Sequence, residues 1–258
     1  MTETRNHPAP ARPSVGLAFG SLLRADFTAA LRSRQTLILN ILVPILYLVI
    51  LGINDAKKQF AAPGLLIGLG ISFGLMAAGM LGYSLLVASD RAAGVFQRLR
   101  VTPTATWLIM GSRITVQLAS ALLMSVVTII IGSIVFHVGF AWTQVLGMLG
   151  VSILGSIMFL CIGQAVVALL KSQGAVNAVG RLLYIVLLLT GILGSTGILG
   201  ETLQSIARWT PVGALTELYA VVFGAAWSGD ATAAIIAVPA YAIVLGFVGI
   251  RFFRWDPR

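Results

Sequence analysis

The sequence predicts an all-α membrane protein with six transmembrane helices, and two observations lead to that fold class. First, 58% of the 258 residues are hydrophobic and only 10% are charged, with a mean hydropathy of +0.98; soluble domains contain about 45–50% apolar and about 25% charged residues. Second, the apolar runs are unbroken over about 20 residues, the length of a membrane-spanning helix, and they do not alternate as barrel strands do. We therefore expect a single transmembrane domain over residues 1–258.

The N-terminal region predicts a flexible tail over residues 1–13 and an interfacial helix over 14–34. Five arginines precede the first apolar run, so the pattern does not fit a cleavable signal peptide. Apolar residues then recur every four positions, on one helical face: Val15, Phe19, Leu23, Phe27 and Leu31. Arg24 and Arg32 turn away from this face, while Asp26 falls close to it. A helix of this kind lies on the inner membrane surface and leads into the first span.

Six spans make up the predicted bundle over residues 36–251, followed by a cytoplasmic tail over 252–258. Their ranges are 36–54, 64–88, 109–135, 144–170, 182–200 and 231–251. On the second span, Gly64 and Gly68, and again Gly70 and Gly74, are spaced four residues apart. Small residues at this spacing let helices approach closely. Span two is therefore predicted to pack tightly, either within the subunit or across a dimer interface.

Basic residues predict the orientation of these spans. With the N-terminus in the cytoplasm, the inner segments hold fourteen of the seventeen Lys and Arg residues once Arg113, near the inner end of span three, is included. These segments are residues 1–35, 89–108, 171–181 and the tail from 251. The outer loops hold only Lys57, Lys58 and Arg208. Because cytoplasmic loops carry the excess of positive charge, we expect both termini in the cytoplasm.

The outer segment 201–230 predicts two short re-entrant helices before the last span. It is too polar to be a seventh span and too apolar to be a free loop. Thr210-Pro211 divides it, because the residue before a proline disfavours the helical conformation. Trp209, Tyr219 and Trp227 are suited to anchor these helices at the membrane–water interface.

The sequence lacks the residue patterns needed for proton-coupled transport, nucleotide binding and hydrolysis. None of the eight acidic residues lies in the middle of a span, so no proton relay of the kind that secondary carriers use is visible. The three lysines do not fall in a phosphate-binding loop, and neither a zinc-protease motif nor a serine-nucleophile motif occurs. We therefore expect a non-catalytic chain that binds no metal or other cofactor itself.

Mildly polar side chains inside spans three and four leave two interpretations open. They either hydrogen-bond between helices or line part of a substrate path. The candidates for such a path are Gln117, Ser120, Ser156 and Gln164.

The connector between spans two and three, residues 89–106, is the most informative segment. Ala92, Val95, Phe96 and Leu99 fall within one helical arc of about 100°. The rest is occupied by polar and charged residues: Asp90, Arg91, Gln97, Arg98 and Arg100. This pattern predicts a short amphipathic helix over 90–100, stopped by Thr102-Pro103, with Asp90 at its start where a carboxylate suits the helix dipole. Physical chemistry alone leaves two roles open: an interfacial connector or a protein-docking site.

The same connector resembles the signature loop of ABC type-2 exporter permeases, those of the daunorubicin-resistance kind in particular. An acidic residue, Arg, two residues and Gly are followed by Arg-Leu-Arg-Val-Thr-Pro; the matching positions are Asp90, Arg91, Gly94, Arg98, Leu99, Val101, Thr102 and Pro103. Asp90 stands where the family has glutamate and keeps the charge. Ala92 replaces a second glutamate and loses one. The interfacial helix, the six spans and the outer helix pair also agree with this family.

The resemblance implies the membrane-spanning permease subunit of an ATP-binding-cassette exporter in a bacterial plasma membrane. Two permeases, identical or sister chains, would pair, and each would dock one cytoplasmic ATPase subunit that binds ATP and Mg. No nucleic acid partner is implied. The implied coupling interface comprises Asp90, Arg91, Gly94, Phe96, Arg98, Leu99, Arg100 and Pro103. For Phe96 and Leu99 the alternative is that they hold the connector to the membrane.

Two rival functions remain at this stage: a stand-alone secondary carrier or channel, and a membrane sensor that docks an ATPase but moves nothing. For an exporter, a largely apolar path favours a hydrophobic or amphipathic substrate such as a drug, an antibiotic or a lipid-like molecule. Polysaccharide, which related permeases export, stays open as another substrate.

Overall fold

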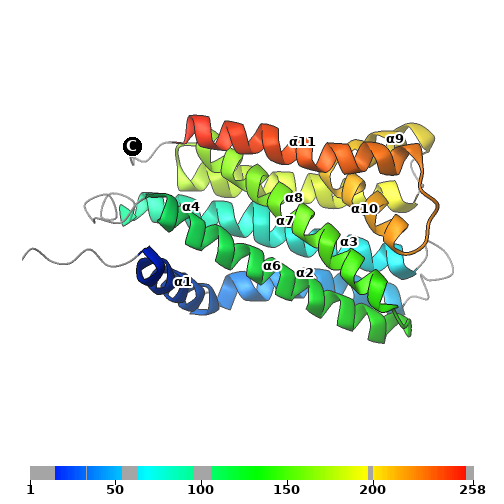
Figure 1. Cartoon of the computed structure of the whole chain (residues 1–258). Helices are drawn as coiled ribbons and strands as arrows, with labels where there is room; N and C mark the ends of the chain where they lie inside the picture. Colours follow the sequence, from blue (N-terminus) through cyan, green and yellow to red (C-terminus); the bar gives the residue numbers. More distant parts are fainter. Residues whose placement is uncertain (1–14, 33, 54–62, 96–105, 197–199, 254–258) are drawn as a thin grey trace, which may run out of the picture.

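A computed structural model describes residues 15–32, 34–53, 63–95, 106–196 and 200–253, and within these ranges every regular element is a helix. The elements are α1 (Val15–Arg32), α2 (Arg34–Ile53), α3 (Pro63–Leu75), the π-helix η2 (Met76–Gly82), α4 (Tyr83–Ala92), α6 (Thr106–Phe136), α7 (Trp142–Leu169), α8 (Gln173–Thr196), α9 (Glu201–Trp209), α10 (Pro211–Val222) and α11 (Gly229–Phe252). They form one elongated bundle (Figure 1). The helix α1, the end of α4 and the C-terminal end of α11 lie at one end, and α9 and α10 lie at the other.

The predicted fold class is confirmed. Five helical stretches are long and apolar enough to cross a membrane: Pro63–Ala92, Leu108–Phe136, Trp142–Leu169, Gln173–Gly194 and Gly229–Phe252. The twenty-residue α2 corresponds to the first predicted span, over 36–54. The chain is therefore a multi-pass membrane protein in which α3, η2 and α4 together form the second span.

Span five was predicted to begin at residue 182, after a cytoplasmic segment over 171–181. The helix α8 begins earlier, at Gln173. The Ser172 hydroxyl accepts a hydrogen bond of 3.1 Å from the amide of Ala175, which caps the helix. The polar residues of this turn mark the membrane surface, not the end of the helix, so Arg181 lies on the exposed side of α8.

Span two lies at the centre of the bundle, where every residue from Leu66 to Met80 is buried. Its spaced glycines fit neighbours within the same subunit: Gly64 and Gly68 face the end of α10, whereas Gly70 and Gly74 face α2. Glycine lets a backbone approach its neighbour without a side chain between them. The close packing predicted for span two is therefore found between helices of the same subunit.

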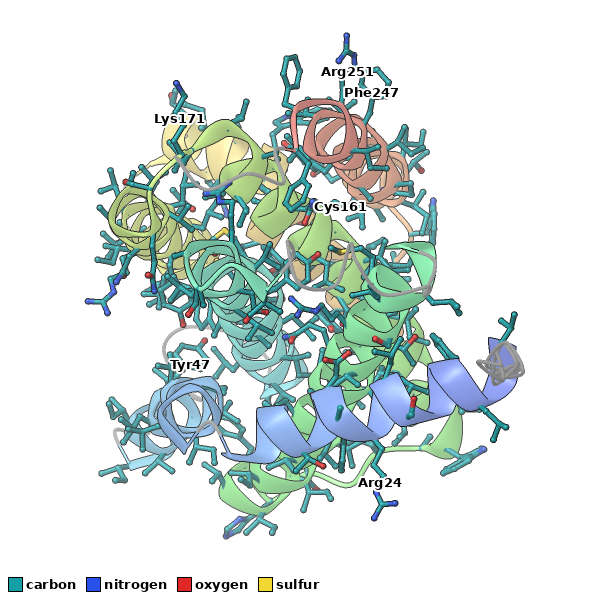
Figure 2. The ribbon with its side chains drawn as sticks, turned by 90° about the vertical axis from the view of Figure 1, so that its left-hand side faces the viewer. Arg24, Tyr47, Cys161, Lys171, Phe247 and Arg251 are labelled. Atoms are coloured by element: carbon teal, nitrogen blue, oxygen red, sulfur yellow. The ribbon has the colours of Figure 1, made fainter. Side chains whose placement is uncertain are left out.

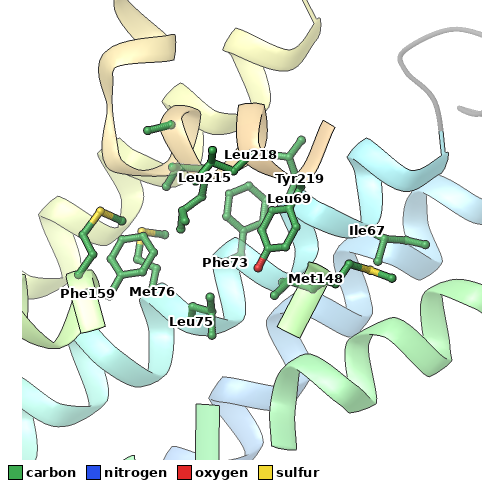
Figure 3. Close-up of a cluster of buried hydrophobic side chains, with 14 of the residues drawn as sticks. Ile67, Leu69, Phe73, Leu75, Met76, Met148, Phe159, Leu215, Leu218 and Tyr219 are labelled. Carbon is green, nitrogen blue, oxygen red and sulfur yellow. The ribbon is translucent and has the colours of Figure 1, made fainter. Parts of the chain in front are cut away.

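The outer helices α9 and α10 confirm the predicted break at Thr210-Pro211. Thr210 is the N-cap of α10 and accepts a hydrogen bond of 3.1 Å from the Gly213 amide. The predicted interface anchor Tyr219 is, however, fully buried in the core, as Figure 3 shows. Its hydroxyl lies 3.0 Å from the hydroxyl of Ser152 on α7. Trp209 and Trp227 are exposed, so these two remain available as anchors.

The helix α1 crosses one end of the bundle and packs on α6 (Figure 2). Phe19 faces Gly111 of α6. The Ser112 hydroxyl donates a hydrogen bond of 2.5 Å to the Asp26 carboxylate, which explains why an acidic residue falls near the apolar face. Arg24 points away from the bundle, as the sequence predicted.

Candidate functional site

Asp90 and Arg91 lie on the last turn of α4, the final part of the second span. The predicted helix over 90–100 does not begin at Asp90, because Asp90 belongs to α4; residues 96–100 of that predicted helix lie outside the described residues. Gly94 has a φ of 69° and ends α4, because a left-handed residue just past a helix is the usual stop and glycine adopts it without strain. Gly94 therefore sets where the connector leaves the helix.

Asp90 forms an ion pair that the sequence did not predict. Its carboxylate lies 2.5 Å from the Arg113 guanidinium on α6, and Arg113 is buried. A carboxylate near a helix C-terminus is disfavoured by the helix dipole, so the arginine offsets an unfavourable position. The pair joins the inner end of span two to the start of span three.

Arg91 is almost completely buried, with 4% of its surface exposed. Its guanidinium donates hydrogen bonds of 3.0 Å to the carbonyl of Val167, 2.7 Å to that of Leu170 and 3.0 Å to that of Lys171. The last carbonyls of a helix have no partners inside it, and Arg91 supplies donors for the end of α7. Arg91 thus fastens the end of α4 to span four.

These contacts converge at one end of the bundle, which we call the inner clamp, defined by Asp26, Asp90, Arg91, Ser112 and Arg113. The inner clamp connects four helices: α4 to α6 through Asp90, α4 to α7 through Arg91, and α1 to α6 through Asp26. In the sequence, only the positions of Asp90 and Arg91 within the motif indicated a functional role. Nothing in the sequence indicated which residues they contact.

The remaining predicted coupling residues, Phe96, Arg98, Leu99, Arg100 and Pro103, lie outside the described residues. Along the chain they lie between Arg91 and Ser112 of the inner clamp.

The four residues suggested for a substrate path make hydrogen bonds inside the subunit. Ser120 donates to Val116 and Ser156 to Ser152, each within its own helix. Gln164 accepts a bond of 2.9 Å from the Tyr83 hydroxyl, and Gln117 donates one of 2.7 Å to the Ala78 carbonyl. These bonds agree with the helix-to-helix interpretation for the two glutamines. None of the four residues lines either of the two hollows described below.

The π-helix η2 was not foreseen. It holds seven residues in the middle of span two, and the Ala78 carbonyl that Gln117 contacts belongs to it. A Cβ added at Gly163 of α7 would lie 2.8 Å from the carbonyl oxygens of both Gly79 and Met80. Such single π turns occur often at functional sites, and here one packs backbone against backbone.

A second cluster of charged residues, which the sequence did not predict, lies among the outer helices. Arg208 of α9 pairs with Asp230 of α11 at 2.5 Å. Glu217 of α10 is half-buried nearby, and its pKa is raised by burial and by the Asp230 charge, against the opposing effect of Arg208. Two hollows of about 290 Å³ and about 140 Å³ open beside these residues.

Together, the fold and the inner clamp define a multi-pass helical membrane protein whose second and third spans are joined by a fastened connector. The model of the ABC-2 type transporter family matches residues 18–224, well over half of the chain, and the chain belongs to this family. It is thus the membrane-spanning permease component, which is not itself catalytic; such permeases generally pair with an ABC ATPase subunit, which binds the ATP. A comparison with curated proteins found no match.

Proposed function

We propose that this chain exports a hydrophobic or amphipathic molecule, using ATP hydrolysed by a separate cytoplasmic subunit that docks on the connector after span two. The observation that carries the proposal is the inner clamp. It fastens the family's motif segment to α6 and α7, and through α6 to α1. A segment that only links two spans has no need of a buried arginine with three carbonyl partners.

Within the proposal, the coupling residues divide into two groups. Asp90, Arg91 and Gly94 position the connector, because two of them are held against the bundle and the third ends α4. Phe96, Arg98, Leu99, Arg100 and Pro103 would meet the ATPase. Closure of the ATPase pair would push the connector, and the inner clamp would pass that motion to the spans.

Five further features belong to the proposal. The exporter would be of the daunorubicin-resistance kind and lie in a bacterial plasma membrane, with both termini cytoplasmic. The excess of basic residues on one side supports that orientation. A second permease, identical or a sister chain, would complete the transporter. Drugs, antibiotics and lipid-like molecules are the proposed substrates.

The test is co-purification of the protein in mild detergent from its native membranes, with the double change Arg98→Glu and Leu99→Asp. A matched control is Arg251→Glu with Phe252→Asp. It makes the same exchange of charge and of an apolar group at exposed positions on the end of α11. We expect an ATP-binding subunit with wild type and with the control, and none with the connector variant.

The other outcomes separate the rival functions. If the ATPase stays with the connector variant, the exporter stands but the docking residues lie elsewhere. If no ATPase accompanies wild type, while the purified protein alone moves a substrate across vesicles, the protein is a stand-alone carrier or channel. If the ATPase co-purifies and a candidate compound stimulates it without transport, the chain is a sensor.

A further inference from the structure

Two hollows flank the outer helices and share a wall. The larger, of about 290 Å³, lies between α8, α9 and α10 beside Leu65 of α3. The smaller, of about 140 Å³, lies between α9, α10 and α11. Arg208 and Glu217 line both hollows. The two spaces therefore form one bipartite pocket, divided by a basic and an acidic side chain.

Several small residues line both hollows. In the larger hollow these are Gly191, Gly194, Ala207 and Gly213, and in the smaller they are Ala214, Ala233, Ala234 and Ala237. They give apolar walls without bulky side chains, and the exposed Trp209 stands at the rim of the smaller hollow. Ligand pockets typically have apolar walls, a few placed polar groups and a volume of about 300–1,000 Å³. The larger hollow lies at the lower end of that range.

The charges of the pocket favour a cation. Arg208 is paired with Asp230, so its positive charge is already compensated. Glu217 makes neither a hydrogen bond nor an ion pair with any residue that the structure describes. Two carboxylates thus face one guanidinium. Burial and then the Asp230 charge raise the pKa of Glu217, and the Arg208 charge opposes them, as expected where two carboxylates share one guanidinium.

We infer that this bipartite pocket binds an organic cation, an ammonium-like group on an apolar body, with Glu217 as its counter-charge. The cation would balance the excess of carboxylate charge, and the apolar body would fill the two hollows. An anion would instead meet two carboxylates and a guanidinium that is already paired. A role for the pocket as the exit site of the exported molecule rests on the proposed export function; binding of the cation does not.

The test uses two ions of nearly the same shape and opposite charge, tetraphenylphosphonium and tetraphenylborate. Their binding to the purified protein in phosphatidylcholine nanodiscs is measured by equilibrium dialysis, with empty nanodiscs subtracted. Glu217→Gln should weaken the binding of the cation about tenfold, the loss of one partly buried charge pair. Glu217→Asp keeps the charge and should retain most of the binding. The anion should bind wild type and Glu217→Gln equally weakly.

Folding is not a confounding factor in this design, because Glu217→Gln places a neutral group where burial already favours one. Unchanged cation binding in Glu217→Gln, or equal changes for the two ions, would overturn the inference. A repeat in nanodiscs containing phosphatidylethanolamine identifies the source of the ammonium group. If this lipid weakens binding of the cation, the pocket binds a lipid headgroup. If it does not, the pocket binds a free amphipathic cation. Either outcome supports a site for an ammonium-like group. No ATPase is present, so the result does not depend on the proposed export function.

Discussion

The Arg91 guanidinium donates a hydrogen bond of 2.7 Å to the Leu170 carbonyl, which joins the end of span two to the end of span four. Hydrogen bonds from charged groups each contribute about 1.5–3 kcal/mol. We expect Arg91→Gln to lower the free energy of unfolding by about 2–3 kcal/mol, because buried carbonyls lose their donor. Unfolding of the detergent-solubilised protein by SDS measures this change.

Two comparisons sharpen that prediction. Arg91→Lys should recover only part of the loss, because lysine keeps the charge but cannot bond several carbonyls with one planar group. Arg181→Gln alters an exposed arginine of α8 and should change the free energy by no more than about 0.5 kcal/mol. Equal effects of Arg91→Gln and Arg181→Gln would show that the buried contacts contribute nothing.

The Asp90–Arg113 pair lends itself to a double-mutant cycle. We expect Asp90→Asn and Arg113→Gln each to destabilise the protein and the double variant to lose less than their sum. The coupling free energy should be about 1–3 kcal/mol, since contacting residues are not additive. The same SDS titration measures it. Additive single effects would mean that the 2.5 Å pair does not hold α4 to α6.

The contact between α7 and the π-helix should tolerate no side chain. Gly163→Ala would place a Cβ 2.8 Å from backbone oxygens of Gly79 and Met80, which cannot rotate away. We expect a loss of about 1–3 kcal/mol from overpacking. Gly150→Ala on the same helix is the matched control, because a Cβ there meets nothing within 4 Å. It should be neutral or stabilising by up to about 1 kcal/mol through better helix propensity.

The stability of the outer helices should depend on pH through Glu217. Its pKa is raised in the folded state, chiefly by burial and then by Asp230 of α11, with Arg208 of α9 opposing. A group whose pKa rises on folding stabilises the protein most below its unfolded pKa, and that contribution is lost as pH increases through the folded value. Wild type should therefore lose stability from this group on going from acid to neutral pH.

Glu217→Gln should remove that dependence. At neutral pH this variant should unfold at a higher temperature than wild type, and near pH 4 the two should converge. Thermal unfolding at a series of pH values checks this, with Asp230→Asn as a contrast that breaks the Arg208 pair. A constant difference between Glu217→Gln and wild type at every pH would contradict the prediction.

Much of the fold was predictable because lipid restricts the choices. A span must satisfy its backbone groups internally, so long apolar runs become helices, and the Thr210-Pro211 break follows from the geometry of proline. The inner clamp was only half predictable. The motif marked Asp90 and Arg91, but arginine is usually a surface residue, and nothing in the sequence paired Arg91 with the end of α7.

Three features had no readable signal. A π-helix and an α-helix differ by one hydrogen-bond step, and the sequence Met-Ala-Ala-Gly-Met-Leu-Gly of η2 suits either. The start of α8 was missed because polar side chains near the membrane surface look the same in a loop and in a helix. Tyr219 was assigned to the interface by its chemical type, yet its partner Ser152 lies 67 positions away in the chain.

The π-helix in span two also limits how this protein can be engineered. A π-helical turn, which is closed by hydrogen bonds from i to i+5, contains about one residue more than an α-helical turn. One residue corresponds to about 100° of helical rotation. The upper and lower halves of span two are therefore out of phase, and no single helical wheel describes residues 63–92. A chimaera that joins α4 to a partner span lacking this extra residue would turn Asp90 and Arg91 away from α6 and α7. Exchanges between permeases that move α4 should therefore include the whole π-helix.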